Sequence, residues 1–209
     1  MTSTGRTARW GLFGGTFNPP HVAHLAIAEA MGQALDLERV VWMPAATSPF
    51  KQGNADAVAP EHRLAMVKLA IAGNPRFVVS DLEIRRAGVS YTIDTVEAMR
   101  AAHPEPALVL LMGGDSLAGF ERWHRWHDLL RHVTLGVYRR PGDGLSADLR
   151  ELPEDLRAAV TVVDAPDMDL SSTQLRKRVS EGHTIRYMIP EALRKYLDEH
   201  GLYKNRAQA

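Results

Sequence analysis

The sequence predicts an α/β fold built on a doubly wound, mostly parallel sheet with helices on both faces. Two observations lead to this prediction. Short apolar runs alternate with segments of helical spacing along most of the chain. The most continuously apolar run, Ala107–Met112, is typical of a central parallel strand that is covered on both faces. We therefore expect a Rossmann-like architecture that ends in a helical C-terminal segment.

Composition and charge narrow the class of protein. The 209 residues are 45% hydrophobic, which is enough for one good-sized core, so we expect a single domain over residues 1–209. The 25 basic and 25 acidic residues cancel, and this balance argues against nucleic acid or an anionic membrane as a partner. The chain has no cysteine and no apolar run of membrane-spanning length, so we expect a cytoplasmic protein. Residues 1–8, which are short and polar, are expected to be a disordered tail.

The first half of the chain shows strand and helix in alternation. Trp10–Phe13 is an apolar run that ends at a glycine pair, and a helical pattern follows two prolines. Val40–Met43 is a second strand that stops at Pro44. The residues from Pro44 to Pro60 are rich in Pro, Gly, Asn, Ala and Ser, which is typical of a mobile loop that acts as a lid.

The later elements follow the same order. Further strands are predicted at Phe77–Ser80, Ala107–Met112, Val133–Tyr138 and Val160–Val163, and further helices at Glu61–Ala72, Thr92–Ala102, Leu152–Ala159, Thr173–Glu181 and Pro190–His200. Right-handed crossovers would connect parallel strands of this kind. The loops after Phe13, Met112 and Val163 then leave the carboxyl ends of strands, where such sheets bind ligands. We expect these three loops to converge on one site.

The loop after the first strand has the features of a phosphate site. Gly14 and Gly15 let the backbone approach a phosphate closely, and the next helix begins with unpaired N–H groups and a partial positive charge. His21 and His24 are three residues apart, so both imidazoles face the same phosphates. The glycine spacing matches neither the P-loop nor the dinucleotide fingerprint. An ordinary glycine turn with two surface histidines is the alternative interpretation.

A second candidate phosphate site lies near the C-terminus. In the run Ser171-Ser172-Thr173-Gln174-Leu175-Arg176, a hydroxyl N-cap opens a helix whose first N–H groups face an anion. Arg176, about one turn in, has a guanidinium that forks onto phosphate oxygens. Taken alone, the same residues would also make a plain capped helix with a solvated arginine.

Together the two segments resemble a known family. Residues 14–24, GGTFNPPHVAH, resemble the G-x-F-[DN]-P-x-H-x-[GA]-H signature of the nucleotidylyltransferase superfamily, and Ser171–Arg176 resembles its C-terminal signature. The resemblance covers nearly the full length and is closest to the bacterial nicotinate mononucleotide adenylyltransferases. It implies AMP transfer from ATP to nicotinate mononucleotide, giving deamido-NAD and pyrophosphate in NAD biosynthesis. Residues 173–203 would be the helical C-terminal part of the same nucleotidyltransferase domain.

The resemblance also implies roles for individual residues. The catalytic residues would be His21, His24 and Arg176. The ATP phosphates would be bound by Gly14, Gly15, Thr16, Phe17, Asn18, Lys51, Ser172 and Thr173. The mononucleotide would be bound by Thr92, Asp115, Trp123 and His124, with backbone N–H groups selecting a carboxylate over a carboxamide.

Several of these residues have alternative interpretations. Asp115 would bind a ribose hydroxyl or cap a helix, and Lys51 would reach the triphosphate or simply solubilise its loop. Phe50 stands where the family has histidine, which weakens the correspondence of that loop. For Trp126 and His127 we favour packing within a two-faced helix. Arg9 and Arg63 receive no functional role.

The reaction implied by the resemblance needs no strong base, because the attacking phosphate is already ionised. Catalysis would come from positioning two anions in line and from stabilising charge on the phosphates. No dedicated metal site is expected, and Mg²⁺ would enter with ATP. The alternatives are an adenylyltransferase for nicotinamide mononucleotide or pantetheine phosphate, and a non-catalytic nucleotide-binding module. The oligomeric state is left open, and a homo-oligomer is compatible with the sequence.

Overall fold

The computed structural model describes residues 7–47, 58–139 and 149–205. Its strands form a 6-stranded sheet in the order β3-β2-β1-β4-β5-β6, and every pairing in it is parallel. The strands are β1 (Arg9–Gly15), β2 (Arg39–Pro44), β3 (Phe77–Val79), β4 (Ala107–Gly113), β5 (Val133–Arg139) and β6 (Val160–Asp164). The predicted fold class is therefore confirmed, and each strand lies within two residues of its predicted bounds.

Six of the described helices also follow the prediction. They are α1 (Val22–Ala34), α2 (Pro60–Ile71), α4 (Thr92–Ala102), α8 (Glu154–Ala158), α9 (Ser172–Ser180) and α10 (Glu191–Glu199). Within the described ranges, three short helices were not predicted, namely α3 (Leu82–Arg86), α5 (Gly114–Leu117) and the 3₁₀ helix η2 (Phe120–Arg122), whereas α6 (Trp126–Leu130) contains Trp126 and His127, for which a helix was the favoured interpretation. The three that were not predicted have three to five residues each, which is too few to show a helical period; α8 is as short, but the sequence pattern that predicted it ran over the longer segment Leu152–Ala159.

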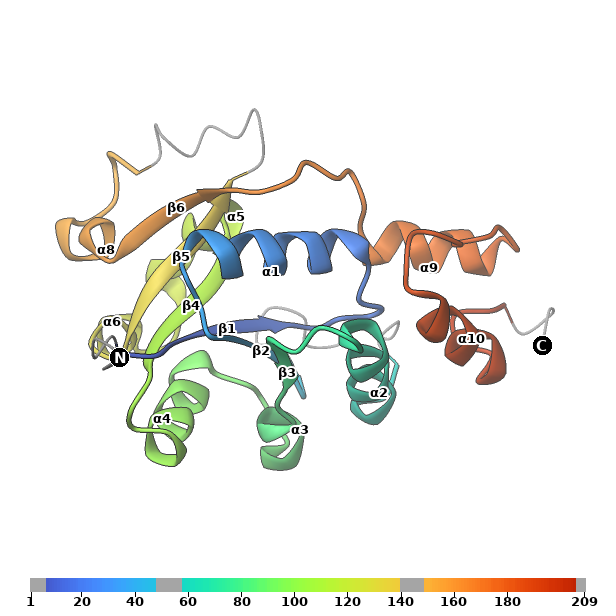
Figure 1. The fold of residues 1–209 in the computed structure, drawn as a ribbon, viewed down its shortest axis with the longest axis horizontal. Coiled ribbons are helices and arrows are strands. Elements are labelled where there is room, and N and C mark those ends of the chain that lie inside the picture. Colours follow the sequence, from blue (N-terminus) through green and yellow to red (C-terminus); the bar gives the residue numbers. More distant parts are fainter. Residues whose placement is uncertain (1–6, 48–57, 140–148, 206–209) are drawn as a thin grey trace, which may run out of the picture.

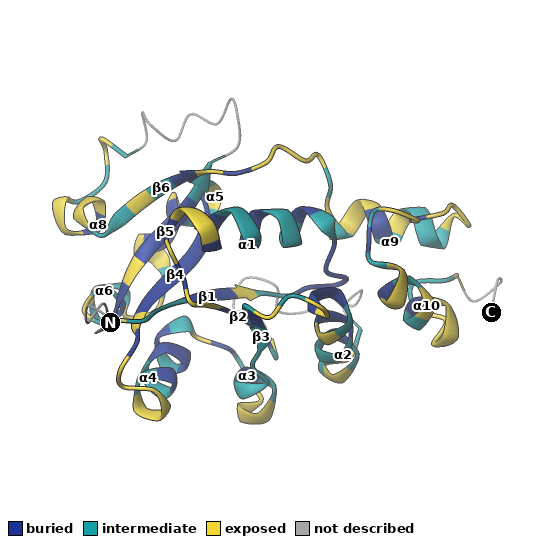
Figure 2. Cartoon of the chain, viewed as in Figure 1, coloured by how far each residue is buried: buried dark blue, intermediate teal, exposed yellow. Residues whose placement is uncertain are grey.

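Two hydrophobic clusters cover the two faces of the sheet. On β4, Leu108, Leu110 and Met112 point into one cluster, which α4 and α6 complete, while Val109 and Leu111 point into the other, which α1 and α2 complete. This alternation follows from the two-residue period of a strand. Helices α1 and α4 accordingly lie on opposite sides of the sheet (Figure 1), and the strands between them are largely buried (Figure 2).

The C-terminal helices form a third cluster at one end of the sheet. Leu175 of α9 and Leu193 and Leu197 of α10 are buried against Met66 and Ala70 of α2. Figure 1 shows α9 and α10 at the end of the molecule beyond the start of α1. The loop before α10 is also tied to the start of α1, because the Val22 N–H donates to the Met188 carbonyl at 3.0 Å. This attachment places α9 beside the first loop of the chain.

The described part of the chain begins at residue 7, just before β1. Residues 1–6 of the expected tail lie outside the described residues, and the Ala8 carbonyl accepts a hydrogen bond of 2.8 Å from the Ala107 N–H. Among the helices that the structure describes, none has the length and apolar character needed to cross a bilayer.

Candidate active site

A cleft of about 730 Å³ opens where the winding of the sheet reverses, between β1 and β4. Its walls come from the loop after β1, the end of β2, the loop after β4 and the start of α4. Open α/β sheets bind ligands at this kind of switch point. Two of the three loops expected to converge, those after β1 and β4, therefore line one site.

In the phosphate loop, Gly14 and Gly15 do not adopt the left-handed backbone conformation that favours glycine, and Gly15 lies close to the ring of Phe17. A Cβ added to Gly14 would meet open space, whereas one on Gly15 would lie 3.0 Å from the ring of Phe17. Phe17 has a positive φ of 49° and is buried, with its ring 5.2 Å from that of Trp42. Its side chain anchors the loop in the core, while Gly14, Gly15 and Thr16 line the cleft.

The two motif histidines form a pair at the start of α1. His21 is the N-cap, and its backbone N–H donates to Nδ1 of His24 at 3.3 Å. The two rings lie 3.8 Å apart between centroids, and His24 lines the cleft while His21 is buried behind it. Because Nδ1 of His24 accepts, Nε2 carries the hydrogen when the ring is neutral. His24 therefore brings a donor to the cleft.

The C-terminal signature packs directly against the first one. The Ser172 hydroxyl donates to the Pro19 carbonyl at 2.7 Å, and Nη1 of Arg176 donates to the Asn18 carbonyl at 3.1 Å. Helix α9 begins one residue earlier than predicted, at Ser172, and Ser171 and Gln174 form a reciprocal capping box at its start. Helix α9 therefore contacts the phosphate loop, but none of the described residues of the third loop or of α9 lines the cleft.

Asn18 has a structural role as well as a place in the signature. Its buried Oδ1 accepts from the Tyr203 hydroxyl at 2.7 Å and from the Val58 N–H at 3.3 Å. Burial raises the pKa of Tyr203 well above its ordinary value, which keeps its hydroxyl a donor. The side chain of Asn18 therefore holds the C-terminal segment and the end of the Pro44–Pro60 loop onto the phosphate loop.

The four residues predicted to bind the mononucleotide all line the other half of the cleft. They are Thr92, Asp115, Trp123 and His124. Thr92 is the first residue of α4, and the ring of Tyr91 lies 4.6 Å from that of His124. The segment around Trp123 is thereby held beside the turn at Ser90–Thr92. Asp115 is not an N-cap, since Gly113 caps α5, so the capping alternative for Asp115 is wrong.

The tryptophan segment is not one continuous helix. Arg125 adopts a left-handed conformation with φ 53°, which separates η2 and the extended Trp123 from α6. Trp126 packs on the cluster under α4, with its ring 6.2 Å from that of Phe120, and His127 stacks on it at 3.6 Å. The predicted packing role of Trp126 is confirmed, and Trp126 and His127 lie in helix α6, which does not extend back to Trp123.

Arg63, which is 2% exposed, was not predicted to belong to the site. Its guanidinium donates to the carbonyls of Thr16 in the phosphate loop and of Ala45 and Ala46 after β2. Burial lowers the pKa of Arg63 from its ordinary value. A signal was present in the sequence, because Arg63 lies three and four residues before the buried Met66 and Val67, on the apolar stripe of α2.

Glu83 and Ser90 were also missed, and both line the cleft. Glu83 is 8% exposed, and its Oε1 accepts from the Thr95 hydroxyl at 2.8 Å. Burial raises the pKa of Glu83, while hydrogen bonds from Thr95 and Ser90 act in the opposite direction. Further polar residues that line the cleft are Tyr91, Thr95, Ser116, Arg122 and Tyr138.

Two predictions concern other parts of the chain. Lys51 and most of the expected lid lie outside the described residues. Among the residues that are described, no group of three or more His, Asp and Glu side chains is arranged to hold a metal ion.

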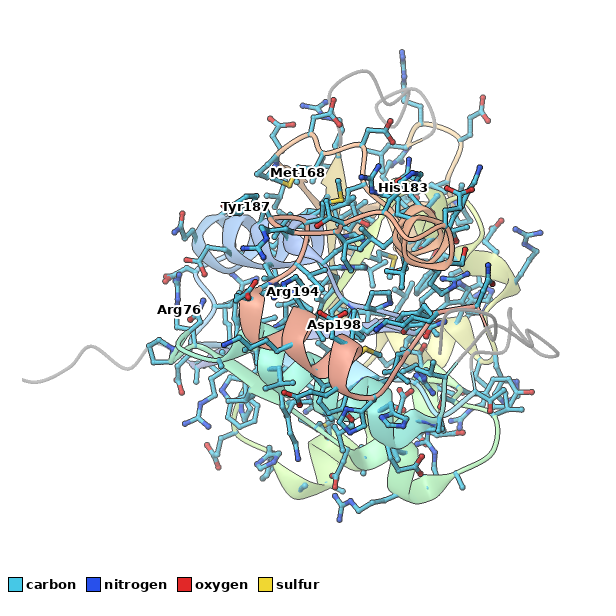
Figure 3. All side chains as sticks on the ribbon, turned by 90° about the vertical axis from the view of Figure 1, so that its right-hand side faces the viewer. Arg76, Met168, His183, Tyr187, Arg194 and Asp198 are labelled. Carbon is cyan, nitrogen blue, oxygen red and sulfur yellow. The ribbon has the colours of Figure 1, made fainter. Side chains whose placement is uncertain are left out.

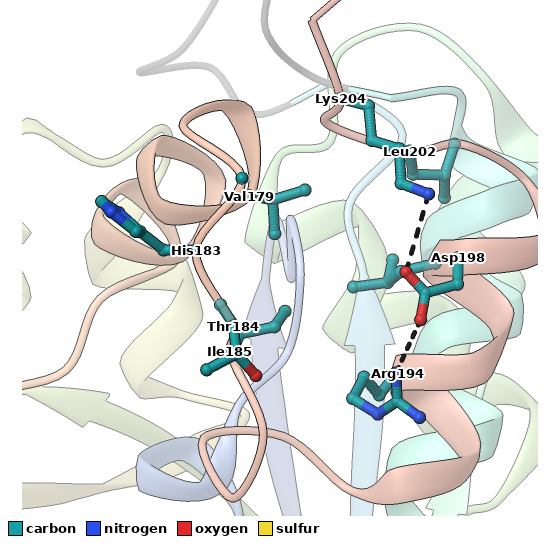
Figure 4. Close-up of a pocket in the computed structure, with 10 residues that line it drawn as sticks. Val179, His183, Thr184, Ile185, Arg194, Asp198, Leu202 and Lys204 are labelled. Carbon is teal, nitrogen blue, oxygen red and sulfur yellow. Dashed lines mark hydrogen bonds and ion pairs between the residues drawn. The ribbon is translucent and has the colours of Figure 1, made fainter. Parts of the chain in front are cut away.

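A second hollow of about 370 Å³ lies between α9 and α10, away from the strand ends. Figure 3 shows this end of the molecule with the labelled Arg194 and Asp198 on α10. Arg194 binds Asp198 at 2.6 Å, and Lys204 lies 3.7 Å from Asp198 (Figure 4). Arg194 also binds Glu191 at 2.7 Å. These cations are neutralised by neighbouring carboxylates, so the hollow lacks the phosphate-binding character of the cleft.

Comparisons with known proteins identify the family of the chain. Residues 12–178 match the cytidylyltransferase-like family. A probable nicotinate-nucleotide adenylyltransferase of Salinibacter ruber is 44% identical over 194 residues, covering 93% of this chain and 97% of that protein. One of the same name from Herpetosiphon aurantiacus is 44% identical over 197 residues, covering 93% and 98%.

A solved structure shows the same fold at low sequence identity. The Plasmodium falciparum nicotinic acid mononucleotide adenylyltransferase complexed with NaAD superposes with a TM-score of 0.76 at 16% identity, covering 94% of this chain and 97% of that one. The family resemblance predicted from the two signatures is therefore confirmed. The chain belongs to the cytidylyltransferase-like family and, within it, to the group of these nicotinate-nucleotide adenylyltransferases.

Proposed function

We propose that this protein transfers AMP from ATP to nicotinate mononucleotide, which yields deamido-NAD and pyrophosphate. One observation carries the proposal: the two signature segments are hydrogen-bonded to each other at Ser172–Pro19 and Arg176–Asn18, beside a cleft whose other half is lined by Thr92 and Trp123. The names of its relatives at 44% identity support the same reaction.

The phosphate half of the cleft would hold ATP. The backbone of Gly14–Phe17 and the start of α1 would receive the phosphates, with His24 donating from Nε2. His21 would act from behind His24, as the group that orients its ring. Arg176, the N–H groups of Ser172 and Thr173, and Lys51 would face the departing pyrophosphate. Asn18 would contribute through its backbone, because its side chain binds Tyr203 and Val58.

The other half would hold the mononucleotide. Trp123 offers an aromatic face to the pyridine ring, and backbone N–H groups at the start of α4 and beside His124 would bind its carboxylate. Asp115 would accept from a ribose hydroxyl. Such donors favour a carboxylate, since a carboxamide presents an N–H₂ group to them and carries no charge. We infer a preference for the acid over the amide.

The chemistry follows from this arrangement. An oxygen of the mononucleotide phosphate attacks the α-phosphorus of ATP, and the bond from that phosphorus to the bridging oxygen of the β-phosphate breaks in line with it. The electron pair of that bond leaves with pyrophosphate, so no covalent enzyme intermediate forms. The chain's own residues align the two phosphates and donate hydrogen bonds to the oxygens on which charge accumulates.

Mg²⁺ would accompany ATP rather than occupy a protein cage. Mg²⁺ keeps several water ligands and commonly binds substrate phosphates, where it neutralises their charge. The donor-rich loop of Gly14–Asn18 fits a metal that is carried by phosphate oxygens. A cytoplasmic location, one domain over residues 1–209, and independence from nucleic acid and membranes belong to the same proposal. They fit a neutral chain that acts on small nucleotides.

A product assay tests the proposal. The protein is incubated with Mg-ATP and nicotinate mononucleotide, nicotinamide mononucleotide or pantetheine phosphate, and the adenylylated products are identified by mass spectrometry. The expected result is deamido-NAD and pyrophosphate in equal amounts, with the highest kcat/KM for the acid. Equal values for acid and amide would refute the role of the carboxylate donors. ATP binding without any pyrophosphate release would indicate a non-catalytic nucleotide-binding module.

A further inference from the structure

Four polar side chains are buried around one short segment between the two halves of the cleft. They are Arg63, Glu83, Ser90 and Thr95, whose exposed fractions lie between 2% and 8%. Burying polar groups costs free energy unless they are hydrogen-bonded, so such a concentration requires mutual partners. The segment that they surround is Ala45–Thr47, here called the bridging segment, which follows β2.

One side of the bridging segment is held to the phosphate loop. The Ala45 N–H donates to the Gly15 carbonyl at 3.0 Å. Arg63 donates to the Ala45 carbonyl at 2.5 Å, to the Ala46 carbonyl at 2.9 Å and to the Thr16 carbonyl at 3.0 Å. A planar guanidinium with five N–H groups satisfies several carbonyls at once, which an ammonium on a flexible chain does less well.

The other side is held to the turn at Ser90–Thr92. The Ser90 hydroxyl accepts from the Ala46 N–H at 3.1 Å, and the Ser90 N–H donates to the Thr47 carbonyl at 2.9 Å. Glu83 accepts hydrogen bonds from the side chains of Ser90 and Thr95. Arg86 in turn donates to the Thr95 hydroxyl at 2.9 Å. Ser90, Glu83, Thr95 and Arg86 therefore form one connected set of hydrogen bonds beside the turn.

We propose that Arg63 and Glu83 are positioning residues that hold the ATP half and the mononucleotide half of the cleft in register through the bridging segment. Arg63 fixes the phosphate loop at Thr16, and Glu83 fixes the acceptor turn through Ser90 and Thr95. In-line attack depends on this register, since a displacement of about 1 Å costs on the order of a hundredfold in rate. The inference rests on the proposed function, because it assigns the two halves to the two substrates.

Substitutions on the Glu83 side test the acceptor half. Thr95→Val keeps the shape of the side chain and removes the hydroxyl that donates to Glu83. We expect KM for nicotinate mononucleotide to rise at least about fivefold while KM for ATP stays within about twofold, because the turn moves relative to the phosphate loop. Thr95→Ser restores the hydroxyl and is expected to restore KM. A purely structural role would change stability without separating the two KM values.

Substitution of Arg63 tests the phosphate half. Arg63→Lys is expected to lower kcat at least about tenfold, because one ammonium cannot satisfy the carbonyls of Thr16, Ala45 and Ala46 together. Arg9→Lys is the matched control. Nη1 of Arg9 also donates to a carbonyl, that of Leu35, but from the amino end of β1, so its kcat is expected to stay at the wild-type value.

Coupling between the halves is tested with a double variant. In Ser90→Ala/Arg63→Lys, the loss of kcat/KM is expected to be smaller than the product of the two single losses, because both substitutions release the same segment. A loss equal to that product overturns the proposal, as does an equal rise of both KM values in Thr95→Val. Thermal unfolding identifies any variant that fails to fold. If Arg63→Lys fails to fold, the KM values of Thr95→Val and Thr95→Ser test the proposal. A wild-type protein that makes no deamido-NAD would instead refute the proposed function.

Discussion

At the scale of single residues, His24 shows how a backbone contact sets the chemistry of a side chain. The N–H of His21 donates to Nδ1 of His24, which leaves Nε2 as the donor toward the cleft. A neutral imidazole in this tautomer stabilises charge on phosphate oxygens without a proton being transferred. The proposed reaction asks for this kind of group, since its nucleophile is already ionised.

Replacement of His24 tests that role. We expect His24→Ala to lower kcat about a hundredfold or more, which is the scale for the loss of one preorganised donor. Steady-state kinetics with nicotinate mononucleotide measure the effect, and circular dichroism verifies that the fold is retained. His103→Ala is the control, because His103 is exposed at the end of α4 and its ring contacts Trp10 instead. Wild-type turnover in a folded His24→Ala protein would refute the assignment.

Glu83 predicts a dependence of stability on pH. Burial raises the pKa of its carboxyl above the ordinary value of about 4.5, so the folded protein binds this proton more tightly than the unfolded chain. The stability that this proton contributes is fully present below pH 4.5 and is lost as pH rises through the folded pKa. Glu83→Gln has no such proton to lose.

The comparison between wild type and Glu83→Gln isolates this contribution. The free energy of unfolding of the variant, minus that of wild type, is expected to increase as pH rises from about 4.5 and then to level off. Urea unfolding at a series of pH values measures the difference. Other titrating groups cancel because both proteins contain them. A difference that is independent of pH would contradict the prediction.

Some site residues could be predicted from their neighbours in the chain, whereas Arg63 interacts with groups far away in the sequence. Gly14, Gly15 and His24 were predicted because their neighbours in the chain make the loop and the helix start. Arg63 was missed because its partners, the carbonyls of Thr16 and Ala46, are 47 and 17 residues away in the chain. The position of Arg63 on the apolar stripe of α2 indicates that it is buried, but backbone carbonyls carry no sequence signature, so only the tertiary structure shows which groups it binds.

At the scale of elements, the strands were predictable and the short helices were not. A strand buried on both faces is a continuous apolar run, and Ala107–Met112 is such a run in any context. Helices of a few residues are stabilised by tertiary contacts rather than by propensity. The break at Arg125, which separates Trp123 from α6, depends on a left-handed residue that is not glycine, and no sequence rule indicates it.

The cap of α9 carries a prediction at this scale. Ser171→Ala removes the oxygen that accepts from the Gln174 N–H at 3.2 Å and is expected to lower the free energy of unfolding by about 1 kcal/mol. It should also raise KM for ATP, because the start of α9 faces the phosphate loop. Urea denaturation and kinetics measure the two effects. Ser180→Ala, at the other end of α9, is the control and is expected to change neither, and an unchanged Ser171→Ala protein would contradict the role of the cap.

At the scale of the whole molecule, the sequence predicts that strands alternate with helices but not in which order they pair. The switch point between β1 and β4 is therefore a structural finding. So is the contact between the two signatures, which lie more than 150 residues apart in the chain. That contact depends on how the third hydrophobic cluster attaches α9 and α10 to α2.

The third cluster predicts a shared loss of stability and function. Leu193 is fully buried between α10 and α2, so Leu193→Ala is expected to lower the free energy of unfolding by about 2–5 kcal/mol. Leu175 of α9 packs in the same cluster, and α9 contacts the phosphate loop, so affinity for ATP is expected to fall as well. Urea denaturation and ATP titration measure both. Leu202, which is only partly buried against the cluster, provides a milder comparison through Leu202→Ala. A destabilised Leu193→Ala protein with unchanged ATP affinity would show that the third cluster does not support ATP binding.

The hydrogen bond between Tyr203 and Asn18 has a consequence for the timing of biosynthesis. The two residues are 185 positions apart, and a ribosome adding about 5–20 residues per second makes Tyr203 some 10–40 s after Asn18. For most of that interval the nascent chain carries the glycine loop and both histidines but lacks Ser172 and Arg176, and it lacks Tyr203 until the end. The first motif to be translated is thus among the last parts of the site to be completed, and a chain still on the ribosome does not yet hold ATP in the arrangement described above.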